Sequence, residues 1–377
     1  MENTFNACAE LLERCLTGTN WSEPLLRRAL SEDDGRAFLN LVVERLSDAF
    51  DPALCEVYER LFAQVIEQTA PDLAPRIRAT ALFPTAPADT DKIYVLSRVT
   101  LGADVAVTSP LIDAVKRRYP HAGIRFVGPR KCYEMFETDS RIVHFPAPYS
   151  RGGSLAERLR SSANLWLTDG LVLDPDSRFT QLGMIAVCPP ANFLHFPSRA
   201  YGADSTHRLP DLAAQWAQEM FKTENARPFV APRPSPCATA DITVSLGIGG
   251  NPAKGLEAKF ETELLKLLAN TGHSVIVDEG GDEPERQRVQ LALPKSMRTH
   301  QGSFASFASL IQQSKLYVGY DSAGGHVASA CGVPVISIAC GFVNPRMAAR
   351  WRPLGNVLNG NAPDLLDQIG AALRVLS

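Results

Sequence analysis

Residues 321–334 form the densest group of chemically useful side chains in the sequence. They read Asp-Ser-Ala-Gly-Gly-His, followed by Val-Ala-Ser-Ala-Cys-Gly-Val-Pro. A strand is expected to end at Asp321, paired glycines allow a close backbone approach, and a helix is expected to begin near His326. Backbone N–H groups at that helix start, together with the Ser322 hydroxyl, could bind an anion. A capped turn alone would not explain serine, Gly324, Gly325 and histidine together.

A second candidate is the glycine-rich segment 247–255, which reads Gly-Ile-Gly-Gly-Asn-Pro-Ala-Lys-Gly. It is not a Walker A loop, because Lys254 precedes its glycine instead of following it. It is not the dinucleotide fingerprint either, because Pro252 stands where a third glycine is required. A flexible loop of backbone N–H groups with one lysine would still be enough to hold a diphosphate.

Carboxylates follow two other expected strands. In Arg98-Val-Thr-Leu-Gly-Ala-Asp, Gly102 permits a tight turn and Asp104 falls at the start of a helix. Asp104 is then either a helix cap, favoured by the helix dipole, or a general base facing a cleft. The acidic segment 277–283 could hold ribose hydroxyls or could be an exposed acidic turn.

The elements that must position these residues change character along the chain. Apolar residues recur every three or four positions over 52–68, which predicts helices for about the first eighty residues. After a proline-rich stretch, strands and helices alternate, and the alternation restarts after a second proline-rich break at 228–236. The expected strands are 92–98, 123–127, 142–145, 171–173, 193–196, 242–246, 275–277, 316–319 and 333–338.

Alternating strands and helices predict parallel sheets with right-handed crossovers. The fold class is therefore α/β, with two Rossmann-like domains facing one another across a cleft and an all-helical N-terminal domain before them. Ligands are expected at the carboxyl ends of the strands. The predicted domains are 1–88 (helical), 89–236 (Rossmann-like) and 237–377 (Rossmann-like).

Composition excludes several classes of protein. The 377 residues are 45% hydrophobic and 21% charged with a net charge of −3, which argues against disorder and against a nucleic-acid partner. Residues 1–88 hold 8 Arg against 14 acidic residues, or −6, which leaves +3 for the rest. The eight cysteines show no disulfide or zinc spacing, and no signal peptide or membrane span is evident, so a cytoplasmic protein is expected.

Several catalytic motifs are missing from the sequence. It contains no G-x-S-x-G, no H-E-x-x-H and no Walker A motif, which disfavours serine hydrolases, zincins and P-loop enzymes. The Asp-x-Asp pattern at 174–176 has the look of a metal-dependent sugar transferase, but it occurs again at 89–91 and therefore carries little information. No metal or cofactor is predicted.

The sequence resembles the ADP-heptose:lipopolysaccharide heptosyltransferases and their relatives among GT-B glycosyltransferases. Residues 321–334 are similar to the family pattern D-(S/T)-G-x-x-H-(L/I)-A-A-A-L-G-x-P, and 303–311 to S-L-x-x-L-A-x-L-I. Residues 98–110 resemble R-x-S-x-G-D-x-x-x-x-x-P, with Ala103 inserted before the aspartate. A second departure is Ala323 in place of glycine, and the segment before Asp91 has no counterpart in the family.

The resemblance, over about residues 92–350, implies an inverting, metal-independent transfer from a nucleotide-diphosphate sugar to a hydroxyl of a glycan, a lipid-linked glycan or a protein. Residues 89–236 would form the acceptor-side domain and 237–377 the nucleotide-sugar-binding domain. Asp104 would be the acceptor base, Lys254 would contact the diphosphate and Glu283 the ribose. The implied substrate-binding residues are Arg98, Gly102, Lys254, Glu283, Asp321, Ser322, Gly324, Gly325 and His326.

Two other functions stay open. A nucleotide-sugar epimerase would need further acid and base groups across the cleft, which the sequence does not identify. A non-catalytic GT-B-like binding protein would result if the inserted Ala103 disabled the base. The acidic helical domain could mediate self-association, recognise a protein acceptor or cap the first Rossmann domain. With a lipid-linked acceptor, the protein would associate peripherally with the inner membrane.

Overall fold

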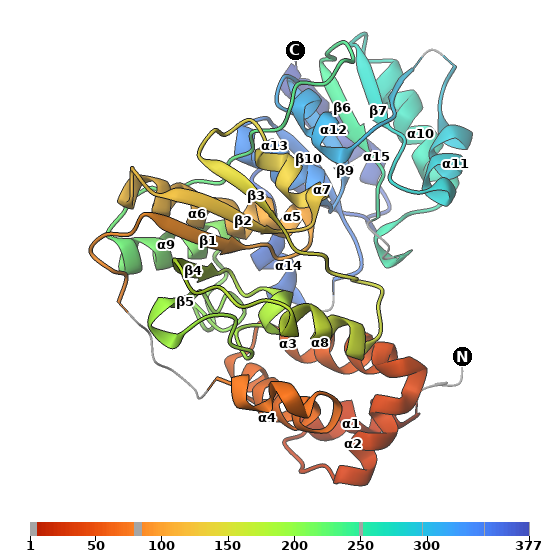
Figure 1. Cartoon of the computed structure of the whole chain (residues 1–377). Helices are drawn as coiled ribbons and strands as arrows, with labels where there is room; N and C mark the ends of the chain where they lie inside the picture. The colour runs from red at the N-terminus through yellow and green to blue at the C-terminus, as the bar shows by residue number, and fades with distance from the viewer. Residues whose placement is uncertain (1–5, 79–84, 249–251, 296, 343, 377) are drawn as a thin grey trace.

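The computed structural model describes residues 6–78, 85–248, 252–295, 297–342 and 344–376. A helical region lies at one end of the molecule and a six-stranded sheet at the other, with a five-stranded sheet between them (Figure 1). No helix of this described part is long and apolar enough to cross a membrane.

The N-terminal region is helical, as its apolar spacing predicts. Its longest helix begins where the Asp51 side chain accepts from the backbone N–H of Ala53 and Pro52 occupies the first turn. Phe38 and Phe62 are fully buried in its core. The helices are α1 (Asn6–Leu16), α2 (Glu23–Ser31), α3 (Glu44–Ser47) and α4 (Pro52–Thr69).

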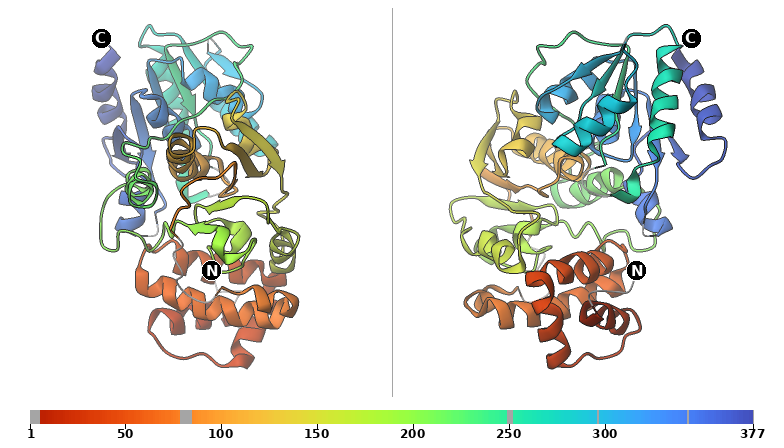
Figure 2. Two further views of the ribbon diagram at one scale, coloured as in Figure 1. Left: turned by 60° about the vertical axis from the view of Figure 1, so that its left-hand side comes forward. Right: turned by 90° about the vertical axis from the view of Figure 1, so that its right-hand side faces the viewer.

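The core of this helical region continues into the following part of the chain. Its members beyond residue 88 include Leu155, Leu159, Leu182, Met184 and Ile185. Polar contacts follow the same path: the Tyr58 hydroxyl donates to the carbonyl of Gln181 at 2.9 Å. Arg76 donates to the carbonyls of Ala163, Leu165 and Ala186. In both views of Figure 2 the helical region lies directly against the rest of the molecule.

The first sheet is entirely parallel and has the order β3-β2-β1-β4-β5. Its strands are β1 (Lys92–Leu96), β2 (Gly123–Gly128), β3 (Ile142–Pro146), β4 (Leu171–Asp174) and β5 (Phe193–His195). The accompanying helices are α5 (Leu101–Ala103), α6 (Ser109–Arg118), α7 (Arg130–Tyr133), α8 (Leu155–Ala163) and α9 (Leu209–Phe221).

The second sheet is also parallel, with the order β11-β10-β9-β6-β7-β8. Its strands are β6 (Ile242–Ser245), β7 (Val275–Asp278), β8 (Arg298–His300), β9 (Leu316–Tyr320), β10 (Val335–Ala339) and β11 (Asn356–Asn359). Its helices are α10 (Ala258–Ala269), α11 (Glu283–Ala292), α12 (Phe304–Ile311), α13 (Ala323–Cys331), α14 (Pro345–Trp351) and α15 (Leu365–Ala372).

These two parallel sheets with their helices confirm the predicted α/β fold class. Strands β8 and β11 are not expected from the sequence, because both are short, polar edge strands without a run of apolar residues. The boundaries proposed near residues 88 and 236 stay predictions.

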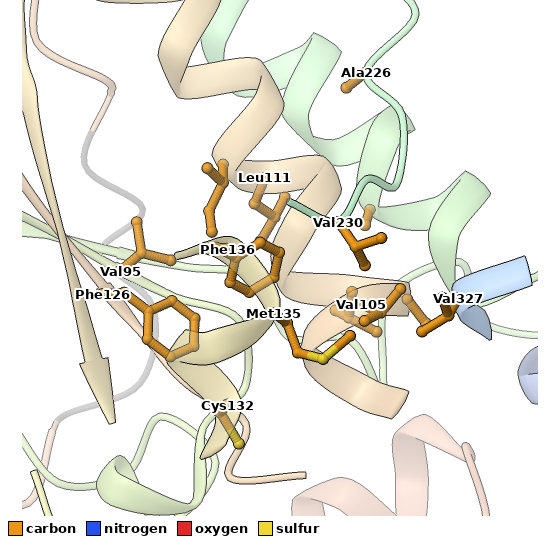
Figure 3. Packing of buried hydrophobic residues seen from close by; sticks show 14 of the residues in the cluster. Val95, Val105, Leu111, Phe126, Cys132, Met135, Phe136, Ala226, Val230 and Val327 are labelled. Carbon is orange, nitrogen blue, oxygen red and sulfur yellow. The ribbon is translucent and has the colours of Figure 1, made fainter. Parts of the chain in front are cut away.

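One hydrophobic core joins the two sheets. It includes Val95 and Phe126 from the first sheet, and Tyr317 and Val335 from the second. In Figure 3, Val327 of α13 lies beside Val105, which belongs to the helical turn after β1. The two parts therefore pack directly at the carboxyl ends of β1 and β9.

We expect a chain that lacks residues 1–88 to be unstable. Removing residues 1–88 exposes Leu155, Leu159, Leu182, Met184 and Ile185, which pack in the core of the helices. Full burial of each such side chain contributes about 1.5–3 kcal/mol to the free energy of unfolding. Urea unfolding should show a large loss of stability or no folded protein, whereas Glu67→Gln, on the exposed surface of α4, should change nothing measurable. A truncated chain that unfolds at the same urea concentration as the full chain would refute this.

Candidate functional site

The amino end of α13 has the geometry of an anion site. The helix starts directly after β9, and Ser322 precedes it without a side-chain capping hydrogen bond. Gly324 packs on Tyr317 so closely that a Cβ there would lie 2.2 Å from the tyrosine oxygen, so only glycine fits. First-turn N–H groups of a helix have no intrahelical acceptor, and with the Ser322 hydroxyl they can bind an anion.

Lys254 reaches this same helix start. Its Nζ donates to the backbone carbonyl of Asp321 at 2.9 Å and to Oδ2 of that residue at 2.8 Å. The structure thus brings together the lysine of the glycine-rich segment and the motif that starts at Asp321. Residues 249–251 of that segment lie outside the described residues.

His326, in the first turn of α13, is enclosed on several sides. It is 8% exposed, and its ring packs edge-on against Trp351 at a centroid distance of 5.8 Å. Burial lowers its pKa to about 4, with the charge of Asp321 opposing this shift and Lys254 and Arg208 adding to it. The imidazole is therefore neutral at neutral pH.

Gly102, in the loop after β1, packs against the start of α13. A Cβ at Gly102 would lie 3.1 Å from Cδ2 of His326 and 3.3 Å from the Cα of Ala323. The helix starts after β1 and after β9 therefore face each other, and a residue larger than glycine would push them apart. Gly325 packs against Pro353 on another side of α13.

Arg98 is buried among the loops that follow β4 and β5. It is 4% exposed, and its guanidinium donates to the Pro175 carbonyl and to the Ser198 hydroxyl, the latter at 2.7 Å. The guanidinium also lies 5.9 Å from the centre of the Trp351 ring. Burial lowers the pKa of Arg98 to about 10. These contacts give Arg98 a structural role, and its contact with a substrate stays a prediction.

Asp104 is fully buried. Its Oδ1 accepts from the backbone N–H of Arg98 at 2.7 Å and from the Thr108 hydroxyl at 2.8 Å, and its Oδ2 accepts from Ser97 at 2.6 Å. Burial raises the pKa of Asp104, and these three donors oppose the increase. The role of Asp104 as an acceptor base stays a prediction, and in this structure its carboxyl group holds the loop after β1.

The physical reason is the helix turn in which Asp104 lies. Asp104–Thr108 is a π-helical turn between α5 and α6, and such a turn accommodates one extra residue in an α-helix. The inserted Ala103 is absorbed there, and the aspartate turns toward the loop. Just before it, Val99 adopts φ +61°, a strained conformation for a β-branched residue, and donates its N–H to Ser97.

Glu283 lies on the surface, and its contact with a ribose stays a prediction. Its side chain is 65% exposed and pairs with Arg286 at 3.2 Å. Glu285 contacts the glycine-rich segment: its Oε1 accepts from Ile248 N–H at 3.1 Å, and its Oε2 accepts from Gly281 N–H at 2.8 Å. Asp282 caps α11, so Glu285 is the third helical residue, which typically reaches back over the helix start. That capping pattern is the sequence signal for Glu285.

Further polar groups line the carboxyl ends of both sheets. His300 lies within 3.0 Å of Asp278 and 3.1 Å of the Ser306 hydroxyl, beside the end of β7. Asp176, from the repeated Asp-x-Asp pattern, is buried and pairs with Arg199 at 2.7 Å. Within the described ranges, no group of three or more His, Cys, Asp or Glu residues could hold a metal ion.

Comparisons with known proteins agree with this geometry. Residues 252–361 match the family model described as glycosyltransferase family 9 (heptosyltransferase). No curated protein matches the chain in sequence.

Solved structures share the fold. A family 9 glycosyl transferase from Veillonella parvula superposes with a TM-score of 0.56 at 16% identity, over 78% of this chain and 98% of that one. The E. coli heptosyltransferase WaaC with ADP gives 0.54 at 14% identity, over 76% and 100%. E. coli ADP-heptose lps heptosyltransferase II gives 0.52 at 17% identity, over 76% and 98%.

The buried role of Asp104 predicts that Asp104→Asn lowers stability. The amide presents one acceptor oxygen where the carboxylate has two, so at least one of the three hydrogen bonds is lost, at a cost of about 2–3 kcal/mol in the free energy of unfolding. Urea unfolding measures this, with the exposed Asp91→Asn as the matched control. If Asp104→Asn is as stable as the wild type, the carboxyl group is not needed for folding, which would favour a role for Asp104 as a base.

The low pKa of His326 predicts a pH-dependent stability. Unfolding takes up a proton between pH 4 and about 6.5, so the free energy of unfolding falls as the pH falls through this window. The contribution is up to ~3 kcal/mol, at about 1.4 kcal/mol per pKa unit. We expect His326→Gln to lose this dependence and the exposed His121→Gln to keep it, in urea unfolding from pH 4 to 7.5. Parallel curves for His326→Gln and wild type would contradict the prediction.

Proposed function

We propose that this chain, whose residues 252–361 match the glycosyltransferase family 9 (heptosyltransferase) model, transfers a sugar from a nucleotide-diphosphate sugar to an acceptor hydroxyl. One observation carries the proposal: Lys254 is held at the start of α13, beside Ser322 and first-turn N–H groups. That set of donors suits a diphosphate.

The donor groups support charge stabilisation on the leaving group. As the bond between the anomeric carbon and the diphosphate oxygen breaks, negative charge grows on the diphosphate. Lys254 and the helix start face that charge and stabilise it without a bound metal ion. In the proposed step the acceptor hydroxyl oxygen attacks the anomeric carbon directly as the bond to the diphosphate oxygen breaks, and the hydroxyl proton passes to the departing diphosphate or to water. Such a single displacement would invert the anomeric centre.

ADP is the nucleotide that the comparisons favour. The E. coli WaaC structures contain ADP and ADP-2-deoxy-2-fluoro heptose, and their chains share this fold at TM-scores of 0.54 and 0.52. Glu285 accepts from the N–H groups of Ile248, in the glycine-rich segment, and Gly281, and we propose it as a contact for the ribose. Glu283, on the exposed surface, stays the residue that the sequence predicts for that role.

The first sheet offers room for the acceptor. A cavity of about 320 Å³ lies at the end of β3, and its lining includes Phe145 and Phe179 as well as the charged Glu157 and Arg160. Pockets that combine apolar and polar side chains are typical of small-molecule sites, so we propose this cavity for the acceptor, whether a glycan, a lipid-linked glycan or a glycosylated protein. A cytoplasmic location and self-association through the helical region stay predictions.

A thermal-shift and calorimetry screen with ADP, GDP, UDP and CMP tests the donor site. We expect one nucleoside diphosphate at about 100 times its Kd to stabilise the wild type by about 2.7 kcal/mol. Lys254→Gln removes the charge and should raise that Kd about 10- to 100-fold. Lys259→Ala, an exposed lysine on α10, should leave it unchanged.

Two results would overturn the proposal. One is a wild type that none of these nucleotides stabilises. The other is equal affinity for the wild type and Lys254→Gln, because the lysine would then have no part in binding.

A further inference from the structure

Trp351, the last residue of α14, connects the helical region to the start of α13. Its ring meets Phe50 edge-on at a centroid distance of 6.5 Å and His326 at 5.8 Å. Phe50 belongs to the N-terminal helical region, just before α4, and His326 belongs to the first turn of α13. The three rings form a continuous contact path between parts of the chain that are about 300 residues apart. In Figure 1, α14 lies between the first sheet and the helical region.

Phe50 is unusual among the residues of the helical region. It is fully buried, yet it belongs to the core that joins the two sheets and not to the core of the helices. Its backbone adopts φ +54°, a conformation that an L-residue keeps only where its surroundings hold it. The next residue, Asp51, caps α4, so the helix start fixes the position from which the ring projects.

Helix α14 holds Phe50 from two sides. Arg346 donates to the Phe50 carbonyl at 2.8 Å, and the Arg350 guanidinium lies 5.3 Å from the centre of its ring. Arg350 is itself fully buried and donates to the carbonyls of Tyr201 and Ala203 at 2.9 and 2.7 Å. Phe50, helix α14 and the loop after β5 that carries Tyr201 and Ala203 therefore pack together, and we call this contact the joint.

We propose that Phe50 is a positioning residue of the nucleotide site, which holds Trp351 against His326 and so keeps the start of α13 in place. The helical region is then a working part of the donor site and more than a cover for the first sheet. This inference rests on the proposed function in one respect, that the start of α13 binds a nucleotide.

The test compares Phe50→Ala with Phe62→Ala. Both remove a fully buried phenylalanine from the helical region, but Phe62 lies in the helical core and is not part of the joint. Two quantities are measured at a temperature where circular dichroism shows both variants folded: the Kd for ADP, or for the diphosphate that binds the wild type, and hydrogen exchange of residues 322–331.

We expect Phe50→Ala to weaken nucleotide binding about tenfold and to speed exchange at the start of α13. Phe62→Ala should lose thermal stability but keep the Kd within about twofold of the wild type. Trp351→Phe keeps an aromatic ring between Phe50 and His326 and should bind nearly as the wild type does, whereas Trp351→Ala should behave like Phe50→Ala. The two tryptophan variants decide the matter if Phe50→Ala does not fold.

The inference is overturned if Phe50→Ala and Trp351→Ala leave both quantities unchanged, or if Phe62→Ala changes them as much. A wild type that binds none of the nucleotides would refute the proposed function instead. Hydrogen exchange then decides alone: faster exchange of 322–331 in Phe50→Ala, but not in Phe62→Ala, supports the joint, and equal exchange refutes it.

Discussion

The burial of the Arg350 guanidinium fixes how the parts of this molecule sit together. A buried cation is costly unless its donors find acceptors, and burial lowers the pKa of Arg350 accordingly. Three carbonyls of the loop after β5, those of Ser198, Tyr201 and Ala203, accept from the two terminal amino groups of Arg350, and Phe50 supplies a ring face, while the buried Nε has no hydrogen-bond partner among the described residues. Because α14 belongs to the second half of the chain, these contacts tie that half to the loop after β5 and to the helical region.

This arrangement places the loop after β1 against the start of α13. With the two sheets in contact, Gly102 packs tightly beside His326, so a larger residue there requires its neighbours to shift, and the loop that carries Gly102 is held by the buried carboxyl group of Asp104. In the proposed reaction, Lys254, the Ser322 hydroxyl and the first-turn N–H groups of α13 are the donors available to the leaving diphosphate. On the other side of this contact, Asp104 lies at the start of a π-helical turn and its carboxyl group is directed into the loop after β1.

The sequence predicts those features that depend on local pattern. Alternating apolar segments are enough for the α/β fold, and the residues from Asp321 to His326 are neighbours in the chain, so their grouping needs no tertiary contact. The directions of the Asp104 and Glu285 side chains could not be predicted, because each depends on one helical turn: Asp104 starts a π-helical turn, and Glu285 is the third residue of α11. The contacts of Phe50 and Arg350 join distant segments and leave no periodic signal.

A crystal structure of the chain with ADP would test the central claim most directly. We expect the diphosphate at the amino end of α13, within hydrogen-bond distance of the Ser322 hydroxyl, the N–H groups of Gly324 and Gly325, and the Lys254 ammonium group. A nucleotide bound anywhere else, or a start of α13 left without a phosphate at saturating ADP, would contradict the assignment of this helix start as the donor site.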